Sequence, residues 1–354
     1  MAFRVLHASS HSDRAHWLQL WHGWPNREVA AHPDYVQLFT DAPEQAIAAT
    51  WESSGTKVLF PLVLRAIGDL PWARGLDGCD LTGPYGYGGP FMWGDHSIDL
   101  EPFWRSFDDW GREARVISAF ARLTLFAADL APMLRGVVAP KQLNIVRTLR
   151  LGDEELLRDY EHKVRKNIKR ATSSGITIEF DQDCSRMHEF LTIYRSTLDR
   201  RSATAGYYFG ADFFRRLCRL LTGQFIFAHA LLDGRVVSTE LVLLSATHAY
   251  SFLGGTLSDA FPMRPNDLLK HEVTRWAREH GKTAYVLGGG YGGEDGIYRY
   301  KRSFSPNGQR EFRVWKHIID TDAYRHAVEV RRRHAQLTNL PWAPIGDFFP
   351  AYRS

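Results

Sequence analysis

The chain has few cysteines, and they follow no pattern of a disulfide framework or a metal site. Cys79, Cys184 and Cys218 are widely spaced and odd in number, without a C-x-x-C motif or a histidine cluster at metal-ligand spacing. We therefore expect reduced cysteines, a cytoplasmic location and no bound metal.

Long apolar runs are also absent. No stretch approaches the ~18 consecutive apolar residues of a membrane-spanning helix. Residues 1–17 lack the charged region followed by an apolar region that marks a signal peptide. The sequence therefore predicts neither a membrane span nor a signal peptide. The net charge, +4 on 354 residues, is small for a nucleic-acid-binding protein and equally fits an ordinary protein surface.

Several well-known catalytic motifs are missing as well. The sequence contains no G-x-S-x-G nucleophile motif, no Walker A motif and no Cys–His pair that the spacing singles out. Any chemistry must therefore come from another kind of site.

What is present indicates a globular protein of two domains. Hydrophobic residues make up 44% and aromatic residues 13% of the chain, which excludes global disorder, and the length suits two domains of ordinary size. We expect an N-terminal domain over 1–145 and a C-terminal domain over 146–318. A C-terminal helix and tail over 319–354 should pack back on the N-terminal domain.

Apolar periodicity, capping residues and turn residues predict the secondary structure. Helices are expected over 12–21, 99–114, 186–200, 212–221 and 267–281, and one long helix should run from Glu154 to its stop at Gly175. Hairpins are expected around residues 52–55 and at Asp233-Gly234. Strands are expected over 3–7, 46–51, 56–64, 116–126, 144–149, 176–180, 225–232, 236–244, 250–254 and 283–287. Residues 68–95, rich in glycine, proline and aromatics, should form a long irregular and functional stretch.

The segment from Tyr285 to Phe304 is the strongest candidate for a site. A short buried strand leads into five glycines within residues 288–293, which let the backbone turn sharply or approach a ligand. Acidic and basic residues follow at once, so one loop combines proton-transfer groups with cations that acyl or phosphate chemistry could use. These residues are Glu294, Asp295, Arg299, Lys301 and Arg302.

Three segments of the second half carry a family resemblance: KVRKNIKRATSSGITIEF (163–180), FPMRPNDLLKHEVTRWAREHG (261–281) and GIYRYKRSFSPNG (296–308). The chain resembles the FemABX peptidyltransferases, over about 160–320 and more weakly over 1–150, where YGYGGPF (85–91) is the matching loop. The resemblance implies an α/β (α+β) fold of two tandem GNAT-like domains, each a mixed, mostly antiparallel sheet flanked by helices. It also implies transfer of an aminoacyl group from a charged tRNA to an amine.

The resemblance suggests roles for the segment around the glycine loop. Lys301 matches the family lysine implicated in stabilising the developing oxyanion, a role that suits a fixed ammonium; a solvated lysine at a strand edge is the alternative. Arg299 and Arg302 are candidates for binding phosphate or the tRNA 3′ end. Asp295, with Glu294 beside it, is the candidate general base, although loop carboxylates are more often simply solvated.

Two further groups are candidates for substrate contacts. Cations on one helix, with Arg264 beyond it, could track the tRNA backbone, and a solvated helix face is the alternative; they are Lys163, Arg165, Lys166, Lys169 and Arg170. Aromatic and glycine residues in the two Tyr/Gly loops could contact the acceptor or donor, and structural tyrosines are the alternative; they are Tyr85, Tyr87, Gly88, Gly89 and Tyr291.

Three hypotheses for function remain. The first is an aminoacyl-tRNA-dependent transferase that needs no cofactor and acts on a small amine-bearing acceptor, either a muropeptide precursor or a specialised metabolite. The second is an acyl-CoA-dependent N-acyltransferase, which the lack of a glycine pair in FPMRPNDLL disfavours because that turn would bind the CoA pyrophosphate. The third is a non-catalytic protein that binds tRNA or a nucleotide sugar. The sequence says nothing of the oligomeric state.

Overall fold

The computed structural model describes residues 2–133, 135–339 and 341–354. Contacts divide the chain into two compact units, the first comprising residues up to Pro25, 30–141 and 312–354, and the second comprising 26–29 and 142–311. The chain changes unit inside strand β7 (Val137–Thr148) and inside strand β13 (Gln309–Ile318). The predicted domain borders after residues 145 and 318 lie close to these two changes.

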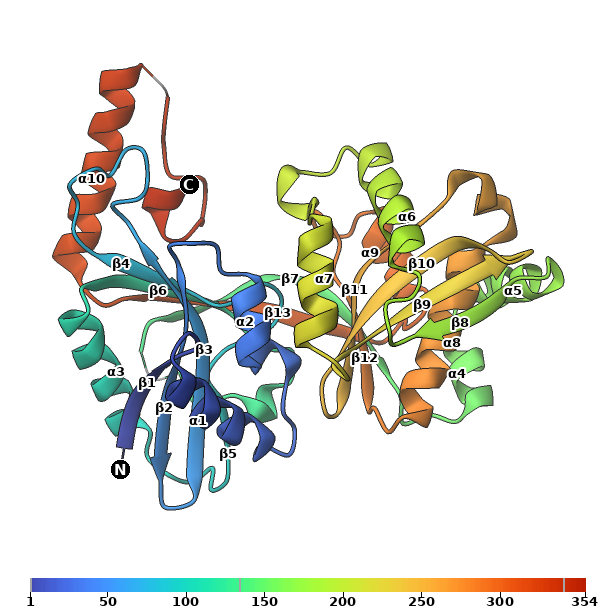
Figure 1. Cartoon of the computed structure of the whole chain (residues 1–354), viewed down its shortest axis with the longest axis horizontal. Helices are drawn as coiled ribbons and strands as arrows, with labels where there is room; N and C mark the ends of the chain where they lie inside the picture. Colours follow the sequence, from blue (N-terminus) through green and yellow to red (C-terminus); the bar gives the residue numbers. More distant parts are fainter. Residues whose placement is uncertain (1, 134, 340) are drawn as a thin grey trace. The chain divides into compact units, whose positions relative to one another are not determined.

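The first unit is built on a mixed sheet in the order β1-β2-β3-β4-β6-β13 (Figure 1). All neighbours are antiparallel except β4 and β6, which are parallel. The strands are β1 (Ala2–His7), β2 (Gln45–Ser53), β3 (Thr56–Ala66), β4 (Cys79–Thr82) and β6 (Val116–Arg122), with β5 (Phe91–Trp93) paired to β3. The predicted irregular stretch 68–95 thus contributes two short strands.

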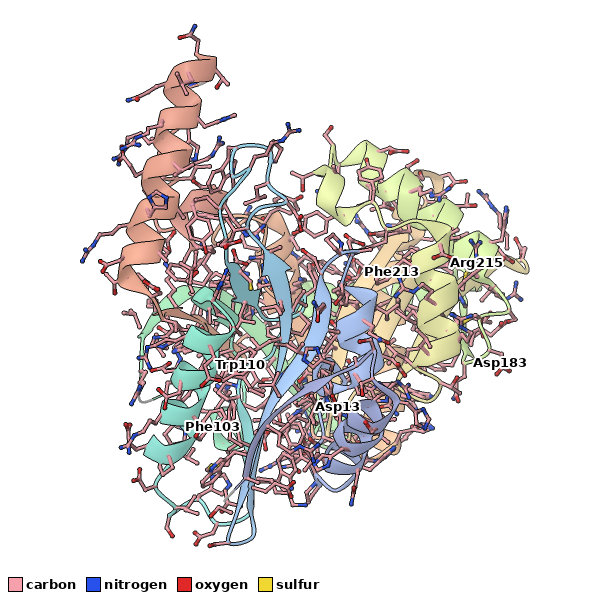
Figure 2. The ribbon with its side chains drawn as sticks, turned by 60° about the vertical axis from the view of Figure 1, so that its left-hand side comes forward. Asp13, Phe103, Trp110, Asp183, Phe213 and Arg215 are labelled. Atoms are coloured by element: carbon pink, nitrogen blue, oxygen red, sulfur yellow. A yellow bond between two sulfur atoms is a disulfide. The ribbon has the colours of Figure 1, made fainter. Side chains whose placement is uncertain are left out.

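Alternation along β2 and β3 gives this sheet two apolar faces, because successive side chains point to opposite sides. Ile47 and Phe60 pack with the helix α3 (Glu101–Glu113), whose Phe103 and Trp110 are labelled in Figure 2. Ala48 and Leu59 belong to a separate core with Trp17 of α1 (His11–His22) and residues of α2 (Pro33–Leu38).

The C-terminal segment packs within the first unit. The helix α10 (Thr321–Thr338) and the 3₁₀ turn η5 (Ala351–Arg353) contribute to a small core with Ile117 of β6. Arg353 Nε donates to the buried carboxylate of Asp80 at 2.5 Å, and the Tyr352 hydroxyl donates to the same oxygen at 3.2 Å. Ion pairing of a fully buried aspartate explains how the tail is fixed there.

The second unit has a sheet in the order β7-β12-β11-β10-β9-β8. Its neighbours are antiparallel except β11 and β12, which are parallel. The strands beyond β7 are β8 (Thr177–Asp181), β9 (Phe225–Leu232), β10 (Arg235–Leu244), β11 (His248–Thr256) and β12 (Ala284–Gly288). Asp233 and Gly234, both at positive φ, form the predicted turn between β9 and β10.

Helices cover both faces of this second sheet. Ile226 and Ala228 of β9 share a core with α5 (His162–Ser173) and α8 (Pro265–Glu279). Phe227, which points to the other face, packs on Phe190 of α6 (Met187–Arg200), and Phe190 also contacts α7 (Ala211–Leu220). Figure 2 labels Phe213 and Arg215 of α7. The parallel pair of β11 and β12 therefore lies in a sheet that helices cover on both faces.

The single helix predicted over 154–175 is wrong, because two helices occupy this stretch. The helix α4 (Asp153–Asp159) ends at Tyr160, whose backbone is extended, and α5 begins two residues later. The break lets the buried Tyr160 ring pack on Phe304, while the guanidinium of Arg147 lies 5.2 Å from its centroid. The N–H of Glu161 then donates to the carbonyl of Ser303. Tertiary contacts thus override a continuous helical periodicity.

The expectation of reduced cysteines is wrong for two of the three. Cys184 and Cys218 form a disulfide, with Cα atoms 6.5 Å apart, that joins the loop after β8 to α7. Their separation of 34 residues matches no spacing rule, so only the fold reveals the pair. Cys79 remains a free thiol. In the part of the chain that the structure describes, no helix is long and apolar enough to cross a membrane.

Candidate active site

The site lies in the second unit, where the parallel strands β11 and β12 separate. They pair at three positions, from His248 opposite Ala284 to Tyr250 opposite Val286. Beyond these, β11 continues beside β10 as far as Thr256, whereas β12 leads into the glycine loop that starts at Gly288. Separated strands expose polar groups that a continuous sheet would bury, so this opening is where a site can form.

A buried ion pair lies beside this opening. Lys270 Nζ on α8 donates to Glu240 Oε1 on β10 at 2.5 Å and to Ser251 Oγ on β11 at 2.7 Å. The two charged side chains are only 9% and 4% exposed. The Tyr285 hydroxyl on β12 donates to the same Glu240 oxygen, also at 2.5 Å. Glu240 Oε1 therefore ties α8 to β10 and β12, and the bond from Lys270 to Ser251 adds β11.

The second carboxylate oxygen of Glu240 differs from the first in its hydrogen bonding. Among the described residues, Oε2 has no hydrogen-bond partner although it is buried. A buried carboxylate oxygen without a donor is costly, so native proteins contain few of them. Burial and the Glu240 charge together raise the pKa of Tyr285 well above its usual value, so that its proton stays in place as a donor.

Asp295 acts as a helix cap. Its Oδ1 accepts from the N–H of Tyr298 at 2.8 Å, and its Oδ2 accepts from the N–H of Tyr291 at 2.7 Å. These bonds start the helix α9 (Gly296–Arg302) and hold the pKa of the carboxyl below its usual value. The carboxylate thereby closes the glycine loop and orients the helix that carries Lys301.

Lys301 lies on the last turn of α9, so the predicted alternative of a strand-edge lysine is wrong. Its Nζ donates to the carbonyl oxygen of Gly289 at 2.7 Å. Burial, and next the Lys270 ammonium, lower the pKa of Lys301 to about 8, while the carboxylates of Glu240 and Asp295 act in the opposite direction. A Cβ on Gly289 would lie 2.4 Å from Asn144 Oδ1, so the close approach of the chain to β7 at this position requires glycine.

The start of α8 is tied to both neighbouring helices. Asn266 Nδ2 donates to the Tyr300 hydroxyl of α9 at 2.8 Å, and Asn167 of α5 donates to Asp267 at 3.0 Å. Burial raises the pKa of Asp267. Arg264, exposed and at φ +61, precedes the helix as its cap residue. These bonds tie the start of α8 to α9, which carries Lys301, and to α5.

The predicted basic residues of α5 separate into two groups. Lys163, Lys166, Lys169 and Arg170 are exposed on the side away from the apolar stripe. Arg165 instead turns back to the carbonyls that end α4, including those of Arg158 at 3.0 Å and Tyr160. Arg165 therefore caps α4 in this structure, while the other four cations of the predicted tRNA-contacting set are exposed.

The other predicted residues of the glycine loop and α9 are more exposed. Tyr291 is 57% exposed, its ring centroid lies 5.5 Å from that of Tyr207, and its hydroxyl lies 3.4 Å from Thr204 Oγ1. Arg299 donates to the carbonyl of Glu294 at 2.8 Å, and Arg302 is exposed at the end of the helix. These three residues lie within ten positions of Lys301 in the sequence and belong, like it, to the second unit.

The predicted tyrosines and glycines of residues 85–89 belong to the first unit. The Tyr85 ring stacks on Phe39, and the Tyr87 ring meets Phe312 edge-on at 5.4 Å. Gly88 exchanges backbone hydrogen bonds with Arg122 and Thr124. Gly89, at φ +119, has no room for a side chain because Leu130 is 2.7 Å from where a Cβ would be. Gly89 therefore has a clear structural reason to be glycine.

Sequence analysis missed Lys270 and Glu240. Both are charged residues within patterns of apolar residues. Lys270 lies among the buried positions of α8, and Glu240 is the one acidic residue in the strand VVSTELVLL. A charged residue within an apolar face is rarely buried without a partner. That rule would have pointed to a buried pair, although not to its neighbour Lys301.

Comparison with known proteins agrees with this architecture. Residues 158–302 match the family described as an acetyltransferase (GNAT) domain. No curated protein shows significant sequence similarity to the chain. Among solved structures, FemX superposes with a TM-score of 0.68 and 13% identity, over 91% of this chain and 99% of that one.

A second solved structure is similar to a lesser degree. The C-terminal domain of an Agrobacterium fabrum protein named for lysylphosphatidylglycerol synthetase has a TM-score of 0.52 and 14% identity, over 88% of this chain and 94% of that one. At such identities the likeness shows the fold alone. Together with the GNAT domain match, it supports an acyltransferase, and the chain has a FemABX-like fold of tandem GNAT-like units.

Proposed function

We propose that the protein transfers an aminoacyl group from a charged tRNA to the amine of a small acceptor, forming an amide. The observation that carries this proposal is Lys301, whose Nζ is fixed on the carbonyl of Gly289 directly after β12, in the unit that holds the Lys270–Glu240 pair. The FemX-like fold supports it. Aminolysis of an ester needs a positioned amine and a stabilised oxyanion but no covalent enzyme intermediate.

In this proposal the second unit binds the donor. The exposed cations of α5 and Arg264 contact tRNA phosphates, which need only charge and spacing and no base recognition. Arg299, Arg302 and Tyr291 contact the 3′ end. The first unit binds the acceptor near Tyr85 and Tyr87, and a muropeptide precursor or a specialised metabolite would supply the amine. We propose a cytoplasmic location, because charged tRNA is found there. The Cys184–Cys218 disulfide is unusual for that location, since disulfides are rare in cytosolic proteins.

The experiment is a transfer assay with a pool of radiolabelled aminoacyl-tRNAs and a panel of amine acceptors. Label should move from the tRNA to an acceptor, and pretreatment with ribonuclease should abolish the transfer. The proposal would be contradicted if folded protein left the label on intact tRNA with every acceptor.

The second candidate is an acyl-CoA-dependent N-acyltransferase, favoured by the GNAT domain match. The turn before α8 lacks the glycine pair that would cradle a pyrophosphate, so we expect little or no affinity for acetyl-CoA. Calorimetry decides between the two donors, since micromolar binding of acetyl-CoA would favour the second candidate.

A further inference from the structure

A polar cavity lies in the second unit, away from the glycine loop. Strand β10 ends at Leu244, and β11 and β12 begin at His248 and Ala284, so these three strand ends meet at one edge of the sheet. The candidate active site follows the other end of β12, at the opposite edge. The cavity has a volume of about 360 Å³, at the small end of the range for pockets that bind small molecules. Its wall is formed by Arg27, Gly223, Gln224, Ser245, Ala246 and Lys282.

The charged side chains in this wall are all cationic. Arg27 and Lys282 are the two charged residues among the six that line the cavity, and none of the six is acidic. The carbonyl of Arg27 accepts from the N–H of Ala246 at 2.9 Å, which holds the backbone of Arg27 beside the turn between β10 and β11. The wall therefore gives the cavity a positive potential, which favours an anion.

The Lys282 ammonium is bound by neutral groups. Its Nζ donates to the carbonyls of Ser245 at 2.5 Å and Ala246 at 3.1 Å. Within the part of the chain that the structure describes, no carboxylate forms an ion pair with it. An ammonium has three N–H donors, so one remains for a group in the cavity. Burial, and next the charge of Arg27, lower the pKa of Lys282, while Glu28 acts in the opposite direction, so the two cations lie close enough to interact.

The Glu28 carboxylate is held by other side chains. Its Oε1 makes a hydrogen bond with His248 Nδ1 at 2.7 Å, and its Oε2 accepts from the hydroxyls of Ser245 at 2.5 Å and Tyr250 at 2.7 Å. Glu28 is only 2% exposed, and it does not line the cavity. The charge of Lys282 is therefore only partly balanced by the protein, and an anion in the cavity would complete the balance.

We propose that this cavity is a binding site for a small molecule that carries a phosphate group. A phosphate group has a charge of about −1.5 to −2 at pH 7, which matches two cations, whereas a carboxylate would balance only one. The Arg27 guanidinium suits two phosphate oxygens at once, and the Lys282 ammonium adds a point charge with its remaining N–H. The site is separate from acyl transfer, because it lies at the edge of the sheet opposite to the loop that binds Lys301.

Calorimetry of the full chain, in a buffer without phosphate, tests the site with three probes: inorganic phosphate, pyrophosphate and AMP. At least one should bind, and the comparison separates free phosphate from phosphate on a nucleotide. Acetate should bind ~10-fold more weakly than the best probe or not at all, because it lacks at least one charge-assisted hydrogen bond. The inference is wrong if none of the three probes binds at millimolar concentration, or if acetate binds equally well.

Lys282→Met and Arg219→Gln form a matched pair of variants. Each removes one positive charge, but Arg219 is exposed on α7 and lies outside the cavity wall. Lys282→Met should weaken binding of the best probe ~10-fold or more, the value of one charge-assisted hydrogen bond. Arg219→Gln should leave the affinity unchanged. Equal weakening by the two folded variants would assign the binding to general surface charge and overturn the inference.

A second measurement uses the unaltered protein, so it holds even if Lys282→Met fails to fold. Acetylation by N-acetoxysuccinimide, read by mass spectrometry of the peptide that contains Lys282, reports whether its amine is covered. The best probe should slow the labelling of Lys282 and leave that of the exposed Lys169 unchanged.

Two results would overturn the inference. One is labelling of Lys282 that is equal with and without the probes. The other is protection by deacylated tRNA but by none of the small probes, which would make the cavity part of a nucleic-acid-binding surface. Neither calorimetry nor acetylation depends on transfer activity, so the outcome is independent of the proposed function.

Discussion

Replacing Lys270 by methionine tests the buried pair on which the site is built. The change leaves the Glu240 carboxylate buried with only the Tyr285 hydroxyl as donor, and it takes a partner from Ser251. Removing one member of a buried ion pair costs about 3–5 kcal/mol, because the remaining charge stays desolvated. We therefore expect the second unit to lose about that much stability. Converting Glu240 to glutamine in the same chain should restore most of it.

The measurement must report on the second unit. Trp276 is the only tryptophan within residues 142–311, so total fluorescence mainly follows the first unit. Hydrogen exchange of peptides from β10 and α8, measured across a urea series, is the better assay. Arg158→Met is the matched control, because the Arg158–Glu154 pair is exposed and should contribute nothing measurable. A loss below about 1 kcal/mol for Lys270→Met, or an equal loss for Arg158→Met, would refute the reasoning that burial makes the pair important.

Three further variants test the site. Lys301→Met should slow the chemical step by ~10²–10³ in single-turnover transfer while both substrates still bind, and a folded variant that transfers at nearly the wild-type rate would remove Lys301 from the mechanism. Charge reversal at Lys166 and Lys169 should weaken tRNA binding and reduce the slope against log salt by about two units, and an unchanged slope would assign them to a solvated face. Asp295→Ser keeps a capping side chain, so transfer should stay within several-fold of wild type, whereas a general base would lose ~10² or more.

Local sequence determined most of the secondary structure. The turn at Asp233-Gly234 is confirmed because positive φ at two consecutive residues favours this pair strongly, and the capped, amphipathic helices α6 and α8 lie close to their predicted ranges. The FemABX-like fold was also predicted, from three segments that follow one another in the second half of the chain, and this prediction is confirmed. Periodicity, caps and turns act over a few residues, so the sequence alone is enough to read them.

Tertiary structure decided what the sequence left ambiguous. Helical periodicity continues through Tyr160, yet the helix ends there because the Tyr160 ring is buried against Phe304, a residue far along the sequence. The same holds for Asp295, which read as a loop carboxylate until its backbone partners were visible.

The candidate site is the clearest case. The sequence singled out Lys301, but its pKa is lowered first by burial and then by the charge of Lys270 on α8, while Glu240 on β10 acts in the opposite direction, and these two residues lie 31 and 61 positions away. Electrostatic influence depends on distance in space and on burial, neither of which follows from spacing along the chain. The sequence thus specified most helices and strands and singled out Lys301 as a candidate, whereas the packing of α8 and α9 gave that lysine its buried surroundings.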